Sequence, residues 1–237
     1  MATPSGQAAD GGPRGAGSGL PGPDPCAALR ERMVREQIAG RGVRDPRVLE
    51  AMGTVPRHLF VPGAVAAEAH ADCPLPIGCG QTISQPYIVA VMAEVLELTG
   101  SERVLEVGSG SGYMAAVLSR LALEVYGVEL EPELHQRSAR ILSRLGCANV
   151  RLRCGDGALG WPEAAPFDAA LLSCAAEALP AEPWAQVAMG GRMVLPVGAP
   201  LGGQELVLVR KTPQGSRITR LMPVGFVPLR RGPELPQ

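Results

Sequence analysis

A glycine-rich run in the middle of the chain has residue types and spacing suited to holding a small ligand. In Glu106-Val107-Gly108-Ser109-Gly110-Ser111-Gly112 the glycines stand where a predicted strand turns into a helix, so backbone amides can approach a ligand closely. A dinucleotide fingerprint, G-x-G-x-x-G, would need its third glycine at the position of Tyr113. The Glu106 carboxylate would also repel a pyrophosphate. The run therefore favours a cationic ligand without phosphate over a dinucleotide.

Two more acidic residues stand at the ends of the next two predicted strands. Glu129 lies 21 residues after Gly108, where a carboxylate can accept hydrogen bonds from both hydroxyls of a ribose. Asp156 can accept from an adenine amino group, while Gly157 keeps the wall of the site thin. Singly, the acids also fit plainer roles, as a solvated strand-end charge, an acid at a helix start and a turn former. Together they predict an acidic cleft for S-adenosylmethionine, bound by Glu106, Gly108, Gly110, Glu129, Asp156 and Gly157.

The elements that must position these residues alternate regularly between strand and helix. We expect a doubly wound, mostly parallel α/β sheet of the Rossmann-like class I methyltransferase type, with ligands at the carboxyl ends of its strands. A final pair of strands with a short connection predicts a C-terminal antiparallel hairpin. Buried strands are predicted at 103–107, 125–129, 150–154, 167–173 and 192–197, helices at 112–120, 132–145 and 183–189, and hairpin strands at 205–210 and 217–227.

The N-terminal part is predicted to be helical before and after an irregular stretch. One helix should run from Cys26 to about Gly42, and a second should follow Asp45, with proline in its first turn. The proline-rich segment 56–78 is predicted to be irregular, and a strongly apolar helix follows Pro86. Residues 1–25 are predicted to be a disordered Gly/Pro-rich tail and residues 26–237 a single domain.

Charge, cysteine content and hydropathy limit the kinds of partner that the protein is expected to bind. The 22 basic and 23 acidic residues nearly cancel, so no global basic field favours nucleic acid or an anionic membrane. The six cysteines form no C-x-x-C pair and have no histidine at finger spacing, which predicts free thiols and no metal. No apolar run approaches the roughly 20 residues needed to span a bilayer. We expect a cytoplasmic monomer that binds neither nucleic acid nor membrane.

A hydroxyl-bearing loop, Gly80-Gln81-Thr82-Ile83-Ser84-Gln85-Pro86-Tyr87, precedes the glycine run by about twenty residues. By itself, Ser84 fits the N-cap of the helix that begins at Pro86. In its wider context, however, the chain between about Met33 and Leu229 resembles the protein-L-isoaspartate O-methyltransferases. The resemblance rests on Val55–His58, Asp72–Tyr87, Glu106–Gly112, Gly155–Gly157, Pro196–Gly198 and Phe226–Leu229.

The resemblance implies transfer of a methyl group from S-adenosylmethionine to the free α-carboxylate of L-isoaspartyl residues in damaged proteins and peptides. It implies that Ser84 is the active-site serine that orients this carboxylate, and that Thr82 and Ile83 line the pocket shared with the cofactor. Val227 would contact the substrate backbone, or equally be a core residue of an edge strand. Two positions depart from the family pattern: His70 replaces an expected aromatic residue, as a partly exposed loop residue, and Cys174 replaces a threonine.

Two other functions remain open. The residues predicted to bind the cofactor would by themselves also suit another S-adenosylmethionine-dependent methyltransferase, one that acts on a small molecule or RNA. The near-zero net charge and the loop at 74–87 count against this alternative. A non-catalytic cofactor-binding adaptor would keep the pocket without the reaction. The intact glycine run, Glu129 and Ser84 count against an adaptor.

Overall fold

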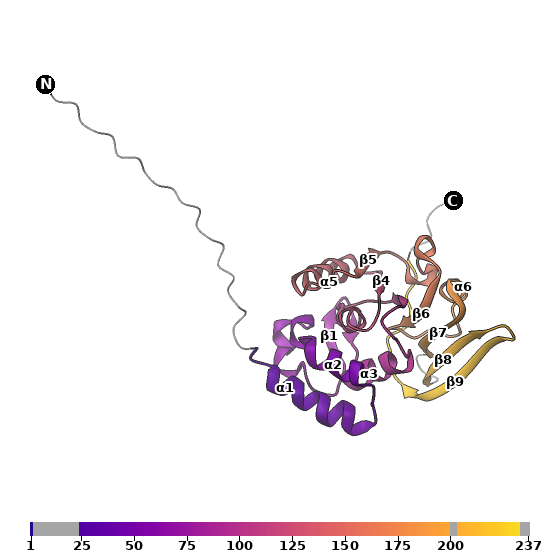
Figure 1. The fold of residues 1–237 in the computed structure, drawn as a ribbon, viewed down its shortest axis with the longest axis horizontal. Coiled ribbons are helices and arrows are strands. Elements are labelled where there is room, and N and C mark those ends of the chain that lie inside the picture. Colours follow the sequence, from indigo (N-terminus) through magenta and orange to yellow (C-terminus); the bar gives the residue numbers. More distant parts are fainter. Residues whose placement is uncertain (2–23, 200–202, 233–237) are drawn as a thin grey trace.

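The computed structural model describes residues 1, 24–199 and 203–232, and its centre is a seven-stranded sheet. The strand order is β5-β4-β3-β6-β7-β8-β9, with parallel pairing from β5 to β7 and antiparallel pairing in the last two pairs (Figure 1). The mostly parallel sheet and the C-terminal hairpin are therefore confirmed. The strands are β3 (Arg103–Val107), β4 (Glu124–Glu129), β5 (Val150–Cys154), β6 (Phe167–Leu172), β7 (Val187–Val197), β8 (Gln204–Thr212) and β9 (Gly215–Val224).

Helices pack on both faces of the sheet because each carries an apolar side. In α5 (Pro132–Arg144), Leu134, Ser138 and Leu142 recur every four residues and are all buried. The two helices on either side of the glycine run, α3 (Pro86–Val95) and α4 (Tyr113–Leu118), are buried on most positions. On the opposite face, α6 (Ala181–Ala185) and the two tryptophans cover a second apolar cluster around Phe167.

The N-terminal helical segment follows the prediction closely. It begins with α1 (Ala27–Arg32), continues through a π-helical turn, η1 (Met33–Ile38), and a 3-10 turn, η2 (Ala39–Arg41), and ends at Gly42. The second helix, α2 (Pro46–Thr54), is capped by Asp45, whose side chain accepts from the amide of Arg47 at 2.8 Å. In Figure 1 these helices lie at one end of the molecule and the β8–β9 hairpin at the other.

Two predicted segments are corrected. Segment 56–78 is not irregular: it contains the 3-10 turns η3 (Arg57–Phe60) and η4 (Gly63–Glu68) and a short strand, β1 (Leu75–Gly78), paired with β2 (Gln81–Ile83). The helix predicted at 183–189 ends at Ala185, and β7 begins at Val187. Tertiary packing decides the second case, because Val187 pairs with Phe167 and is buried in the second cluster.

The predicted tail lies almost wholly outside the described residues. The described residues resume at Asp24, which accepts a hydrogen bond from the amide of Cys26 at 2.9 Å. Within the described ranges, no helix combines the length and apolar character needed to cross a membrane.

Candidate active site

The site lies where the sheet reverses its winding order. After β3 the chain proceeds outward to β4 and β5, and it then returns to place β6 on the other side of β3. In open α/β sheets a ligand crevice forms at such a switch point, outside the carboxyl ends of the strands. The glycine run follows β3 and Ser173-Cys174 follows β6, so both segments border this crevice.

Close packing requires the glycines of the run. Gly108 has φ 79°, and a Cβ there would lie 3.3 Å from the Sγ of Cys174. Gly112 is the N-cap of α4 with φ 85°, and a Cβ there would lie 2.9 Å from the Cβ of Ser138 on α5. The early third glycine is thus explained by the approach of the loop to α5.

Glu106 is fully buried, so the explanation of a solvated strand-end charge is wrong. The Ser173 hydroxyl donates to its Oε1 at 3.4 Å, while its Oε2 has no partner among the described residues. Burial is the main cause that raises the pKa of Glu106 to about 8; the bond from Ser173 lowers it and the charge of Glu129 raises it further. The Ser109 hydroxyl is also buried without a partner in the described structure. Both groups line the same small cavity, of about 30 Å³.

Two backbone amides, one of them in the glycine run, hold the side chain of Glu129 in place. Its Oε2 accepts from Gly110 at 2.6 Å and its Oε1 accepts from Glu131 at 2.9 Å. It lines a second cavity, of about 60 Å³, together with Gly108, Gly110 and Gly157. This carboxylate therefore has a fixed orientation toward the crevice.

Asp156 lies at the end of β5 beside this second cavity, although it does not line it. Its Oδ1 accepts from the amide of Ala158 at 2.8 Å, and its Oδ2 accepts from the amide of Gly232 at 3.1 Å. The turn-forming role is therefore present in the structure. The adjacent Gly157 leaves no room for a side chain, because a Cβ would lie 2.6 Å from the Cγ1 of Val107.

Residues 226–232, the C-terminal segment, cover the second cavity. Ala175 donates to the carbonyl of Val227 at 2.8 Å and accepts from the amide of Leu229 at 2.7 Å. Arg230 pairs with Glu131 at 2.5 Å. Val227 lies beyond the end of β9, so it is not an edge-strand core residue, and it lines both the second cavity and a third one.

The Ser84 loop is held by a buried arginine. Arg57 is 0% exposed and donates to the carbonyl of Ser84 and to the carbonyl of Ala69, each at 2.7 Å. Its guanidinium lies 4.7 Å from the ring centre of Tyr113. The N-cap of α3 is Gln85 and no side chain caps the helix, so the N-cap explanation for Ser84 is wrong.

The third cavity, of about 330 Å³, is lined by the Ser84 loop, Arg41 and the first residues of the C-terminal segment; we call it the outer cavity and the first two the inner cavities. Thr82 and Ser173 line all three cavities, and Ser84 lines the first and the third. These residues therefore lie where the three cavities adjoin one another, and we call the three cavities together the cleft. Of the residues expected from the sequence, the structure brings together Thr82, Ile83, Ser84, Glu106, Gly108, Gly110, Glu129, Gly157 and Val227 around this cleft.

Several lining residues were missed by sequence reasoning. Ser173 lies at the junction, and its position at the end of the central strand predicted at 167–173 was a usable signal. Arg41 lines the third cavity, pairs with Asp72 and stacks on the ring of Tyr87, with 3.6 Å between guanidinium carbon and ring centre. Nothing in the local sequence of Arg230 indicated its contact with Glu131, which is 99 residues away.

The two departures from the family pattern have different outcomes. Cys174 is a buried wall of the second cavity, and burial, followed by the charges of Glu129 and Glu106, raises the pKa of its thiol to about 12. It is therefore a neutral side chain. His70 is only 6% exposed, so the expectation of a partly exposed residue is wrong; it packs against the ring of His58, with 6.0 Å between ring centres.

Comparisons with known proteins agree on one family. A family model described as Protein-L-isoaspartate(D-aspartate) O-methyltransferase (PCMT) matches residues 28–234. A protein-L-isoaspartate O-methyltransferase 2 from Anaeromyxobacter sp. (strain Fw109-5) is 62% identical over 203 residues, 86% of this chain and 84% of that protein. A solved protein-L-isoaspartate O-methyltransferase superposes with a TM-score of 0.77 at 29% identity, over 84% of this chain and 65% of that one. A PCMT structure from Plasmodium falciparum, in complex with S-adenosyl-L-homocysteine, has the same fold, with a TM-score of 0.75, 24% identity, and 86% and 99% coverage.

Proposed function

The chain belongs to the protein-L-isoaspartate(D-aspartate) O-methyltransferase family, and we propose that its cleft methylates the free α-carboxylate of L-isoaspartyl residues in damaged proteins and peptides. The observation that carries the proposal is the junction at Thr82, Ser84 and Ser173 between two inner cavities and one outer cavity. A methyl donor in the inner cavities and a peptide in the outer one would meet at this point.

The polar groups around the inner cavities suit S-adenosylmethionine, which supplies a methyl group already activated on a sulfonium. The buried Oε2 of Glu106 and the hydroxyl of Ser109, which have no partners among the described residues, can bind its ammonium group. Glu129 keeps free lone pairs for ribose hydroxyls, since each carboxylate oxygen accepts only one of the hydrogen bonds described above. Asp156 likewise keeps free lone pairs and can accept from the adenine amino group.

Ser84 would orient the attacking carboxylate. A carboxylate is ionised at neutral pH, so the reaction needs no general base, and catalysis depends on alignment and on the exclusion of water. A hydroxyl can donate one hydrogen bond and leave the second carboxylate oxygen free to attack. Arg57 supports this role, because its bond to the carbonyl of Ser84 fixes the backbone that carries the hydroxyl.

Val227 would contact the backbone of the peptide. Its carbonyl already accepts from the amide of Ala175, whereas its own amide has no hydrogen bond among the described residues, and the residue lines the outer cavity. Thr82 and Ile83 would separate the methyl donor from bulk solvent. Arg41, which is paired with Asp72, also lines the outer cavity.

The test offers S-adenosylmethionine labelled on its methyl group with two peptides that differ only in isoaspartate versus aspartate. We expect label on the isoaspartyl peptide alone; equal labelling of both would contradict the proposal. Ser84→Ala should lower kcat with little change in cofactor affinity, whereas Ser143→Ala, an exposed serine on α5, should match the parent protein. A serine variant with unchanged turnover would remove Ser84 from the catalytic group.

We also propose that the protein is a cytoplasmic monomer whose methyl transfer needs no metal ion and whose partners include neither nucleic acid nor membrane. The free state of all six cysteines supports a reducing compartment. Light scattering on eluted protein tests the monomer, and activity that survives a chelator tests the independence from metal.

A further inference from the structure

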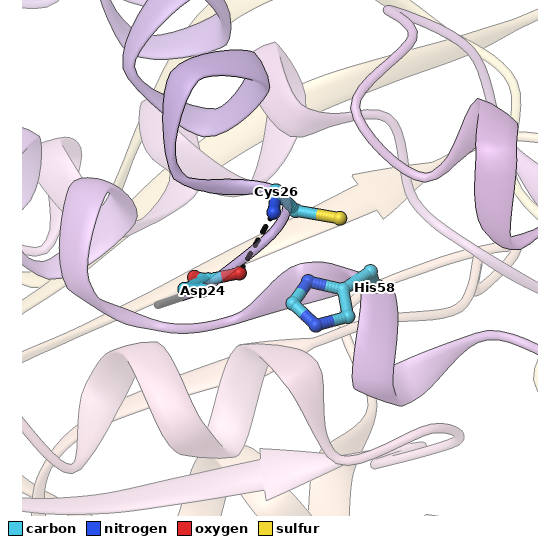
Figure 2. A group of neighbouring side chains, drawn as sticks. All are labelled: Asp24, Cys26 and His58. Atoms are coloured by element: carbon cyan, nitrogen blue, oxygen red, sulfur yellow. Dashed lines mark hydrogen bonds between the residues drawn. The ribbon is translucent and has the colours of Figure 1, made fainter. Parts of the chain in front are cut away.

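A group of potential metal ligands lies away from the cleft, at the start of the described domain. Asp24 and Cys26 stand immediately before α1 and His58 stands in η3, and one donor atom from each lies within 4.8 Å of the other two. In Figure 2 the three side chains converge, with a ring nitrogen of His58 on the side of Asp24 and Cys26. Across the described ranges, this is the single group of three such residues.

The fold leaves two of the three donors unused. The Nδ1 atom of His58 is buried and has no hydrogen-bond partner among the described residues. Cys26 is the N-cap of α1, yet its side chain makes no capping bond, and its thiol is free. A buried polar atom without a partner costs free energy, so an occupant that binds it would stabilise the folded state.

Asp24 is a carboxylate that two hydrogen bonds hold in a fixed orientation. Its Oδ1 accepts from the amide of Cys26 at 2.9 Å and its Oδ2 accepts from Arg30 at 2.5 Å. Arg30 in turn donates to the carbonyl of Gly53 at 2.6 Å. Each carboxylate oxygen accepts only one of these hydrogen bonds and so keeps a lone pair for a metal ion.

A second histidine lies beside the group. His70 packs against His58, with 6.0 Å between the ring centres, and is almost completely buried. It therefore forms one wall of the group.

We propose that Asp24, Cys26 and His58 form a binding site for a divalent cation of the zinc class, with water as the fourth ligand. A thiolate and an imidazole select a borderline-soft ion, whereas Mg²⁺ and Ca²⁺ require mostly oxygen ligands. At the usual bond lengths, neighbouring ligand atoms around tetrahedral zinc lie about 3.5 Å apart. The present separations of up to 4.8 Å thus need a closure of about 1 Å, which side-chain rotation can supply.

The site would join the first described residues to the support of the Ser84 loop. His58 directly follows Arg57, which donates to the carbonyl of Ser84. Bound metal would therefore restrain both α1 and η3 without taking part in methyl transfer. The inference does not depend on the proposed activity, because its test measures metal binding alone.

The experiment titrates Zn²⁺ into the full-length protein, stripped of metal, against a chromophoric chelator. We expect one tightly bound equivalent, unaffected by excess Mg²⁺. Cys26→Ala and His58→Ala should each weaken zinc binding by more than about a hundredfold, since even partners outside the ligand set are worth ten- to a hundredfold. Because Cys26 makes no capping bond, Cys26→Ala should keep the fold, which circular dichroism checks.

Matched controls use the same residue types elsewhere. Cys154→Ala, at an exposed thiol, and His135→Ala, on α5, should bind zinc like the parent protein. Co²⁺ should give a thiolate charge-transfer absorption that disappears in Cys26→Ala. Either of two results would overturn the proposal: the folded parent protein binds no stoichiometric zinc, or the Cys26 and His58 variants bind as tightly as the controls.

Discussion

Replacing Glu106 by glutamine should remove a pH-dependent loss of folding stability. The carboxyl group is fully buried, and its pKa is raised from 4.5 to about 8 in the folded protein. Glutamine has nearly the same shape, and its amide oxygen can still accept from Ser173. Its NH₂ group can donate toward the Ser109 hydroxyl, which is buried in the same cavity. The substitution therefore changes the titration with little change in packing.

The direction of the pH dependence follows from the number of protons bound to the folded and to the unfolded chain. Below about pH 4.5 Glu106 is protonated in both the folded and the unfolded chain and contributes no pH dependence. Between about 4.5 and 8 the unfolded chain loses this proton while the folded chain keeps it, so stability falls as pH rises. The pKa difference of about 3.5 corresponds to at most about 5 kcal/mol, and the loss levels off above pH 8.

The assay is urea unfolding of the ligand-free parent and Glu106→Gln proteins between pH 5 and 9. The free energy of unfolding of the variant minus that of the parent should increase with pH and reach a plateau above about pH 8. Carboxyls with lowered pKa values, such as Glu102 and Glu124, act at more acidic pH and cancel in the difference. A difference that stays constant over this range would refute the assignment of a protonated, buried Glu106.

Two further predictions concern the walls of the second cavity. Gly157→Ala should lower the free energy of unfolding by about 1–3 kcal/mol and weaken cofactor binding, because its Cβ would lie 2.6 Å from the side chain of Val107. In Gly155→Ala the Cβ would meet nothing within 4 Å, so this control should change neither quantity appreciably. Thermal melting and cofactor binding measure the two effects. At pH 8 iodoacetamide should label the exposed Cys154 and leave Cys174 unmodified in the folded protein. A thiol with a pKa of about 12 is only roughly one part in 10,000 thiolate at this pH, and the thiolate is the form that reacts. Rapid labelling of Cys174, detected by mass spectrometry, would contradict this prediction.

The central sheet was predictable because its strands are short apolar runs between glycine and proline signals. The predicted bounds of β3 and β5 agree with the structure at both ends. Segment 183–189 was harder, since it is too short for helix and strand periodicity to differ clearly, and its pairing with β6 decides the outcome. The 3-10 turns in segment 56–78 likewise depend on tertiary contacts of Arg57 and Phe60.

Strand ends and glycine spacing were enough to predict some of the residues that line the cleft. Glu129 and Gly157 line the cleft as the sequence suggested. The burial of Glu106 was not predictable, because it depends on β4 and β6 lying on both sides of β3. The Asp24–His58 group was also hidden, since a search for metal-ligand spacing does not connect Cys26 with a histidine 32 residues later.

The C-terminal segment has a kinetic consequence for the order in which ligands bind. Val227 lines both the cavity proposed for the nucleoside and the cavity proposed for the peptide, and the amide of Gly232 donates to the carboxylate of Asp156 that is proposed to bind adenine. A nucleoside bound there would contact the C-terminal segment, and a docked peptide would hold that segment in place over it. This arrangement favours ordered addition, with the methyl donor first and the peptide second, and departure in the reverse order.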